Sequence, residues 1–184
     1  AFAQPPGRGR PHRLVTRFSG LLGAARAQGG AETGKNPTDR GKPGTKRHVV
    51  VDRQGVPLAV RLSAANVHDS RMMLDTVDAI EPIKRPVGRP RRRPEKLHAD
   101  KGYDSGPLRE GLRRRSITRR IARRGIESSE RLGRHRWVVE RTISWLNRYR
   151  RLRIRYERRA DMHLAFLHIG CALICLKFLN RELC

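Results

Sequence analysis

Acidic residues are few in this sequence. Its 184 residues include 17 Asp and Glu against 42 Lys and Arg, so the formal net charge is +25 and the pI is about 11.7. Such an excess predicts a polyanionic partner, because basic side chains neutralise phosphates and release their counterions. Nucleic acid is the leading candidate and an anionic membrane surface the second. A solvated basic surface without a specific partner is the third interpretation.

Cysteine is also scarce. Three cysteines do not make a disulfide framework, which favours a reduced, cytoplasmic protein. His168, Cys171 and Cys175 have a spacing that a metal site could use, but buried cysteines are the favoured interpretation. Residues 163–179 form an apolar run that is short and contains two histidines and a lysine. This run therefore predicts a buried helix rather than a membrane span, and no membrane partner is expected.

The first 30 residues lack both a sustained hydrophobic period and the apolar core of a signal peptide. They are rich in Gly, Pro, Arg and Ala, which predicts weak order. The chain also begins without Met. We therefore expect residues 1–30 to be poorly ordered or out of frame, and residues 31–184 to form one domain.

The middle of the chain predicts alternating strands and helices. "KRHVVVD" and "VPLAVRLS" are apolar runs separated by a short turn, which is typical of a β-hairpin. The predicted elements that follow are a helix beginning at Asp69 or Ser70, a Pro/Arg-rich loop over 81–95, a strand over 96–100, a helix over 107–115 and a strand over 116–122.

The last third predicts long helices. Within residues 136–156 one continuous helix is expected, with an apolar stripe made of Val138, Trp145, Leu146, Tyr149, Leu152 and Tyr156. Glu140 falls on another face of this helix, together with Arg136, Ser144, Asn147 and Arg151. The order of elements predicts an α/β domain with a mixed β-sheet flanked by helices and long C-terminal helices.

Asp100 and Glu140 suggest one chemistry when they are considered together. An aspartate that follows a strand commonly caps the next turn, and a single helical glutamate carries little information. Transfer of phosphodiester bonds, however, requires divalent cations held by several carboxylates. Surrounding arginines would hold the DNA backbone and keep those acids ionised.

Two motifs carry a resemblance to a known family. "LHADKGYDS" together with "RWVVERT" at this separation resembles the DDE transposases of bacterial insertion sequences, in the group of insertion sequence five, and the similarity extends over about residues 24–180. The resemblance implies an RNase H-like fold and a site with two Mg²⁺ or Mn²⁺ ions. It also implies DNA cleavage and strand transfer at the ends of an insertion sequence. The expected partners are the DNA of the element ends and the target DNA, and the protein could form a homodimer.

The resemblance assigns roles to individual residues. Asp100 matches the second acid of the family and Glu140 the third, so both are expected to be catalytic and to bind metal. Arg136 matches the arginine that precedes the glutamate, whereas Asn147 and Gly133 replace a basic residue and a tyrosine of the usual pattern. The residues expected to contact DNA are Arg91, Arg92, Arg93, Lys101, Arg136, Arg141, Asn147, Arg148 and Arg151.

The first acid of the family is missing. Its place falls near Leu21, and the nearest acids, Glu32, Asp39 and Asp52, lack the expected context. We expect a reading-frame slip or truncation upstream, and hence a defective transposase fragment of the bacterial cytoplasm and nucleoid that retains DNA binding. A non-catalytic basic nucleic-acid-binding protein is the alternative, and a nuclease of the same fold stays open.

Two further features have a simpler interpretation beside a functional one. "GRPRRRP" at 88–94 is similar to sequences that lie in A·T minor grooves, but a solvated loop with non-specific phosphate contacts is favoured. His68 and Asp69 follow a predicted strand, where a role near metal ions is conceivable. Capping of the next helix by Asp69 or Ser70 is favoured.

Overall fold

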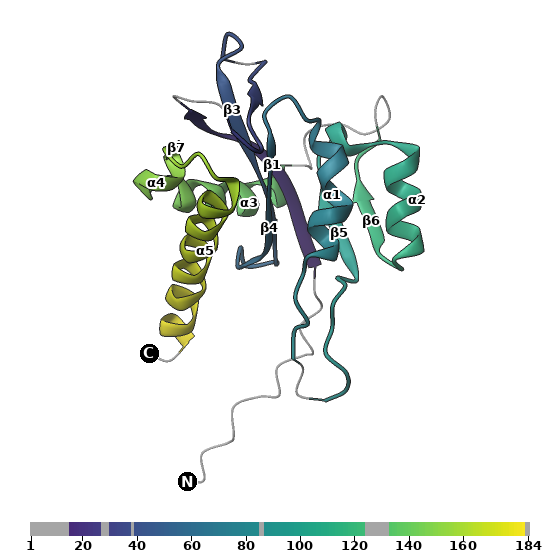
Figure 1. The fold of residues 1–184 in the computed structure, drawn as a ribbon. Helices are drawn as coiled ribbons and strands as arrows, with labels where there is room; N and C mark the ends of the chain where they lie inside the picture. Colours follow the sequence, from purple (N-terminus) through teal and green to yellow (C-terminus); the bar gives the residue numbers. More distant parts are fainter. Residues whose placement is uncertain (1–14, 27–29, 38, 85–86, 124–132, 183–184) are drawn as a thin grey trace.

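The computed structural model describes residues 15–26, 30–37, 39–84, 87–123 and 133–182, with the backbone alone for 15–26, 133–136 and 181–182 (Figure 1). The strands are β1 (Val15–Arg26), β2 (Gly34–Lys35), β3 (Pro43–Val51), β4 (Pro57–Ala64), β5 (Lys96–Ala99), β6 (Thr118–Ile121) and β7 (Ile154–Arg155). The helices are α1 (Asp69–Asp78), the 3₁₀ turn η1 (Lys101–Tyr103), α2 (Gly106–Arg114), α3 (Gly133–Asn147), α4 (Arg150–Arg153) and α5 (Ala160–Glu182).

The strands form one mixed sheet. β3 pairs antiparallel with β1, β2 and β4, whereas β5 runs parallel to both β1 and β6. The short β7 pairs parallel with the end of β1. The prediction of an α/β domain with a mixed sheet flanked by helices is confirmed, and the arrangement agrees with the RNase H-like fold that the resemblance implied.

β1 corrects one prediction. It lies in the middle of the sheet, between β3 and β5, although its residues belong to the segment for which the sequence predicted weak order. Its Gly- and Ala-rich sequence has little intrinsic preference for a strand, so the pairing with its neighbours supplies the order. The rest of the segment, residues 1–14 and 27–29, lies outside the described residues. The division into 1–30 and 31–184 stays a prediction.

Both faces of the sheet are covered by helices, so the apolar side chains that alternate along β3 are buried in two separate cores. Val50 packs with residues of α1, α2 and β5 on one face. Val49 and Val51 pack with residues of α3 and α5 on the other. Figure 1 shows the same division, with α1 and α2 on one side of the sheet and α3, α4 and α5 on the other.

The first half of β3 is buried as well, although it is polar. Burial of such groups is tolerated when their donors and acceptors are paired. The hydroxyl of Thr45 donates to the carbonyl of Glu32. The ammonium of Lys46 donates to the carbonyl of Val67 and lies 3.0 Å from the carboxylate of Asp69. Arg47 donates to Asn147, and His48 forms a hydrogen bond of 2.7 Å with Ser63.

The buried imidazole of His48 makes stability depend on pH. Burial lowers its pKa from 6.5 to about 4, with Asp69 opposing and Lys46 reinforcing the shift. Below pH 6.5 the unfolded chain therefore binds a proton that the folded chain refuses. We expect the free energy of unfolding to fall by about 3 kcal/mol as the pH drops from 6.5 through 4. Urea unfolding across this range measures it, and His48→Gln should flatten the pH dependence. An equal slope in both proteins would contradict the assignment.

Most of the predicted middle elements are present. The hairpin is β3–β4, and the elements that follow it agree with the predicted order. One detail differs, because His68 caps α1: its Nδ1 accepts from the backbone N–H of Ser70. Asp69 instead pairs with Lys46, so the two residues considered for a role near metal ions are engaged in local structure.

The predicted continuous helix over 136–156 is wrong. α3 ends at Asn147, a turn follows, and Tyr156 is exposed beyond β7. The cause is tertiary: a Cβ at Gly170 of α5 would lie 2.8 Å from Leu152 and within contact distance of Tyr149. α5 therefore approaches the turn closely, and the break in the helix lets Leu152 pack beside Gly170.

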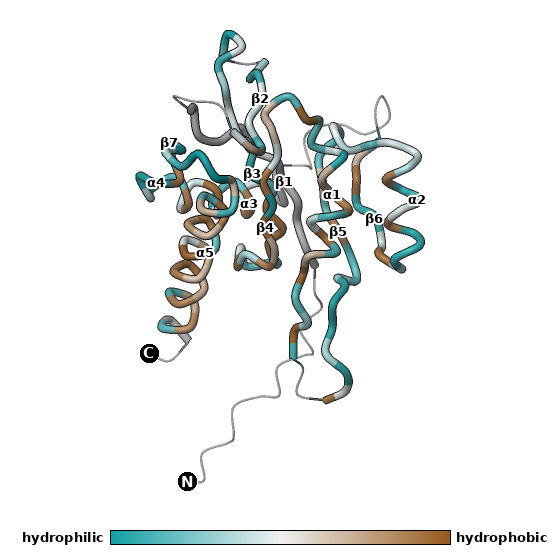
Figure 2. Tube along the Cα trace, in the orientation of Figure 1, coloured by the Kyte–Doolittle hydropathy of each residue, from teal (hydrophilic) through white to brown (hydrophobic). Residues whose placement is uncertain are grey.

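The prediction of a buried C-terminal helix holds for one face of α5 and is wrong for the other. Leu167 and Ile174 are buried, but only 22% of its most apolar stretch is. By length and composition Ala160–Asn180 could span a membrane. This is weak evidence for a membrane span, because one face of the helix packs on the core of the domain. Figure 2 shows the brown, apolar character of α5. Its exposed large apolar residues are Met162, Ile169, Leu173, Leu176 and Leu179.

Candidate active site and nucleic-acid interface

Asp100 directly follows β5, at the carboxyl end of a strand that runs parallel to the central β1. One of its oxygens, Oδ1, accepts from the backbone N–H of Lys101 at 2.7 Å and so caps η1. The capping role that the sequence allowed is therefore present. The side chain is half-buried, and Lys101 beside it is half-buried too.

The second aspartate of the same motif has a structural task. Asp104 accepts from Nε of Arg109 at 2.7 Å, and the same guanidinium donates to the carbonyl of Ile121. This bridge joins the turn after β5 to α2 and to the end of β6. It thereby fixes the loop that carries Asp100.

Glu140 lies on α3, which packs against β1 and β3. The helix buries Val138, Val139 and Ile143 and leaves Glu140 exposed, as the predicted separation of the two faces requires. The β3–β4 turn holds the helix in place. Thr142 donates to the carbonyl of Gly55 at 2.7 Å, and Gly55 has a φ of +96°, which favours glycine.

Arg141 is occupied within the protein. Its guanidinium lies over the rings of Trp137 and Trp145, at 4.5 and 4.8 Å from their centroids, and donates to the carbonyl of Gln54. These cation–π contacts hold it along α3. The side chain of Arg136, also predicted to contact DNA, lies outside the described side chains.

The position predicted for the first acid lies in β1. Leu21 is paired with Arg47 of β3, and directly opposed residues of an antiparallel pair are close neighbours. Arg47 is buried, and burial lowers its pKa to about 10. Its Nη2 donates to Asn147 at 2.6 Å, while Nε and Nη1 have no hydrogen-bond partner among the described residues. A buried cation therefore lies opposite this position.

Two of the three nearby acids that the sequence analysis considered, Asp39 and Asp52, are engaged elsewhere. Asp52 accepts from the backbone N–H groups of Gln54 and Val56, at 2.8 Å each, and so shapes the β3–β4 turn. Asp39 lies 3.7 Å from Lys42 in the preceding loop. Across the described part of the chain, no three or more His, Cys, Asp or Glu residues come together as a metal-binding group.

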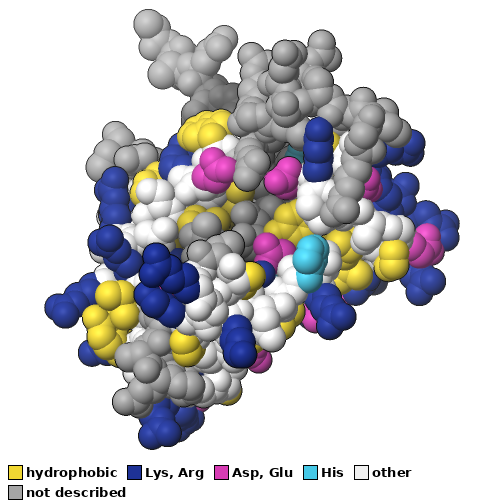
Figure 3. All heavy atoms as spheres, turned by 90° about the horizontal axis from the view of Figure 1, so that it is seen from above, with side chains coloured by type: hydrophobic (Ala, Val, Ile, Leu, Met, Phe, Trp, Pro, Cys, Tyr) yellow, Lys and Arg dark blue, Asp and Glu magenta, His cyan; other side chains and the backbone are white. Residues whose placement is uncertain are grey.

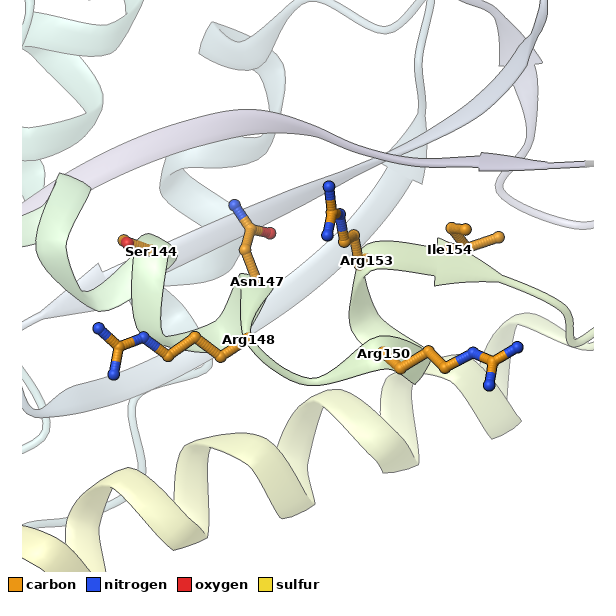
Figure 4. A pocket seen from close by; sticks show the side chains of 6 residues that line it. All are labelled: Ser144, Asn147, Arg148, Arg150, Arg153 and Ile154. Atoms are coloured by element: carbon orange, nitrogen blue, oxygen red, sulfur yellow. The ribbon is translucent and has the colours of Figure 1, made fainter.

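A wide cleft, which we call the basic cleft, is lined by residues that come shortly after Glu140 in the sequence. It has a volume of about 800 Å³ and begins at Ser144, one helical turn beyond the glutamate. Figure 4 shows its side chains along the end of α3, α4 and β7, with the guanidinium groups of Arg148 and Arg150 extending in different directions. The residues that line it are Ser144, Asn147, Arg148, Arg150, Arg153 and Ile154.

The Pro/Arg-rich loop forms a second basic surface. Arg91, Arg92 and Arg93 line a hollow of about 480 Å³ together with Arg89 and Pro90. Arg91 lies 2.9 Å from Glu95, whereas Arg92 and Arg93 are exposed. Figure 3 shows Lys and Arg side chains at many places over one face of the molecule.

Arg151 does not line the basic cleft, unlike Arg150 and Arg153 on either side of it. It lies 2.9 Å from Glu157, with its guanidinium 5.6 Å from the ring centroids of Tyr156 and of Phe166. Contact with a phosphate would therefore compete with these interactions. Arg47, Arg150 and Arg153 were not among the predicted site residues, because one arginine resembles another in so basic a sequence.

Comparisons with known proteins identify relatives. The family model described as the transposase DDE domain matches residues 15–175. The chain is 49% identical over 181 residues to the protein named as the transposase for insertion sequence element IS402 in Burkholderia cepacia, over 98% of this chain and 86% of that protein. It is 27% identical over 139 residues to the corresponding protein of element IS6501 in Brucella ovis, over 72% and 98%.

Two solved structures are also similar. A chain of the simian T-cell lymphotropic virus intasome in complex with the PP2A regulatory subunit B56 gamma has 14% identity and a TM-score of 0.43, over 79% of this chain and 44% of that chain. The catalytic core domain of BIV integrase has 11% identity and a TM-score of 0.40, over 74% and 68%.

Proposed function

The chain belongs to the transposase DDE domain family, and from this premise we propose that Asp100 and Glu140 are the carboxylates of a site for DNA cleavage and strand transfer at insertion-sequence ends. This chain retains DNA binding and is defective in strand transfer. It acts in the bacterial cytoplasm, on nucleoid DNA. A nuclease of the same fold would use the same residues.

One observation carries the proposal. Asp100 lies at the carboxyl end of β5, next to β1, and α3 packs across the same β1 while it exposes Glu140. The basic cleft begins one turn beyond Glu140. A carboxylate one helical turn from a cleft lined by arginines is suited to bind a divalent cation next to a phosphate.

The residues fit one hard divalent ion better than two. Asp100 and Glu140 offer carboxylate oxygens, which Mg²⁺ and Mn²⁺ prefer. A second ion would need a further acid, and the described residues contain no cluster of three candidate ligands. Where Mg²⁺ is bound at such a site, it polarises a phosphate oxygen. The arginines of the basic cleft would hold the neighbouring phosphates and orient the strand.

A non-catalytic basic nucleic-acid-binding protein is the second candidate, and the net charge of +25 favours it. The two candidates differ in what the acids do. In a binding protein without a metal site, Asp100 and Glu140 only repel phosphates or cap local structure. In the proposed site they repel phosphates until a cation neutralises them.

The test measures DNA affinity by fluorescence anisotropy at constant ionic strength, with and without Mg²⁺. On adding Mg²⁺, we expect the affinity of the native chain relative to that of Asp100→Asn/Glu140→Gln to rise roughly tenfold, because only the native acids gain a cation. An equal response of both proteins would favour the non-catalytic binding protein. As a control, replacement of Arg91, Arg92 and Arg93 by Ala should flatten the salt dependence and keep the Mg²⁺ response.

A further inference from the structure

A smaller pocket lies where the end of α3 meets α5. We call it the aromatic pocket; its volume is about 220 Å³. Trp145 and Phe178 meet edge to face at its wall, with ring centroids 5.9 Å apart, and the buried Ile174 lies behind them. The residues that line it are Trp145, Arg148, Tyr149, Ile174, Lys177 and Phe178.

The lining of the aromatic pocket selects the chemistry of its ligand. Three aromatic rings offer flat apolar surfaces, while the exposed Arg148 and Lys177 supply positive charge at the rim. No acid is among the lining residues of this pocket in the described structure. Its volume is below the ~300–1,000 Å³ of clefts that hold drug-sized ligands, so it suits a single ring system with an anionic attachment. A nucleobase on its phosphate has this chemistry.

The aromatic pocket lies next to the basic cleft, because Arg148 lines both. A DNA strand with its phosphates in the basic cleft would therefore pass the mouth of the aromatic pocket. Aromatic side chains beside a positively charged groove are the combination by which proteins bind single-stranded nucleic acid. Bases within a duplex are paired and stacked, so only an unpaired base can enter.

We propose that the aromatic pocket binds one unpaired nucleobase of a DNA strand held in the basic cleft. The rings of Trp145, Tyr149 and Phe178 surround the base, and Arg148 and Lys177 hold the adjoining phosphate. The inference rests on the proposed DNA binding and adds a preference for single-stranded or locally opened DNA. It does not involve Asp100 or Glu140.

Tryptophan fluorescence tests the proposal. The chain has two tryptophans, so Trp137→Phe leaves Trp145 as the single reporter. An oligothymidylate of about ten nucleotides should quench Trp145 emission and bind about ten- to a hundredfold more tightly than an abasic oligonucleotide of equal length and charge. Thymidine monophosphate, as a separate arm, distinguishes a free nucleotide from a base within DNA and should quench only at far higher concentration.

Matched variants locate the effect. Phe178→Leu keeps the apolar bulk and should reduce the preference for thymidylate over the abasic strand at least severalfold. Tyr156→Leu removes an exposed ring outside the pocket and should leave that preference unchanged. Circular dichroism and urea unfolding of each variant separate a lost contact from a lost fold.

Each outcome decides between the claims. Equal, salt-dependent binding of both oligonucleotides without quenching would overturn the base site and leave the proposed DNA binding intact. If neither oligonucleotide binds, the proposed function fails, and so does the inference that rests on it. Without DNA, sedimentation could show a stable dimer in which acrylamide does not quench Trp145. A second copy of the chain would then fill the aromatic pocket, and this result would also overturn the base site.

Discussion

We expect the chain to join no detectable DNA ends in a strand-transfer assay, with either Mg²⁺ or Mn²⁺. Two carboxylates hold a hard ion weakly, and without a third acid the attacking and leaving oxygens are not both stabilised. Loss of one such electrostatic contact costs a factor of about 10² to 10³ in rate, or about 3 to 4 kcal/mol. Position 21 of β1 holds leucine opposite Arg47, where the resemblance requires an acid.

The assay compares three proteins on matched element-end DNA. They are the native chain, Leu21→Asp, and a chimera whose residues before Gly30 come from the Burkholderia cepacia relative. We expect joining only by the chimera, because a single Asp leaves the rest of β1 unchanged, and we expect Glu140→Gln in the chimera to abolish it. Robust joining by the native chain that Glu140→Gln removes would contradict the prediction, and Asp39 and Asp52 would then be the first acids to replace.

Arg155→Leu should lower the free energy of unfolding by about 3–5 kcal/mol, since buried oxygens would lose their donors. Arg155 is 1% exposed and lies in β7. Its guanidinium joins the loop before β2, the start of β3 and the segment after β7 through hydrogen bonds of 2.7–3.3 Å. The acceptors are the carbonyls of Ala31, Glu32, Glu157 and Arg158 and the hydroxyls of Thr33 and Thr45.

Equilibrium urea unfolding measures the loss. Arg155→Lys keeps the charge but not the planar fork of donors, so it should recover only a small part of the stability. Arg153→Leu is the matched control, because Arg153 is exposed two residues away and should change stability by less than about 0.5 kcal/mol. A loss below about 1 kcal/mol in Arg155→Leu would show that the hydrogen bonds are replaced by water.

The parts of the fold that the sequence predicted are those with strong local patterns. The β3–β4 hairpin follows from two β-branched runs around a short turn, and the structure adds Ser105 as the N-cap of the predicted helix α2. β1 was missed because its strand conformation depends on neighbours distant in the sequence. The end of α3 at Asn147 was missed because the helical period continues past it, and only the approach of Gly170 reveals the break.

The candidate site divides in the same way. Asp100 and Glu140 stand in recognisable motifs, so the sequence alone proposes them as site residues, and their role stays a prediction. Arg47 and Arg155 were missed because nothing in an arginine-rich sequence separates a buried guanidinium from a solvated one. The aromatic pocket was missed too, since the spacing of Trp145 and Tyr149 predicts a packed stripe and says nothing of the opening beside Lys177.

The central place of β1 has a consequence for the synthesis of the protein. β1 leaves the ribosome first, yet Val15 pairs with Lys96 and Ala25 with Ile154. Such non-local, parallel pairing makes folding slow, because a long loop must close before the contacts form. The β3–β4 hairpin can form early and pair with one edge of β1, whereas the other edge of β1 stays unpaired until β5 has been translated. During that interval the unpaired edge exposes the nascent chain to aggregation.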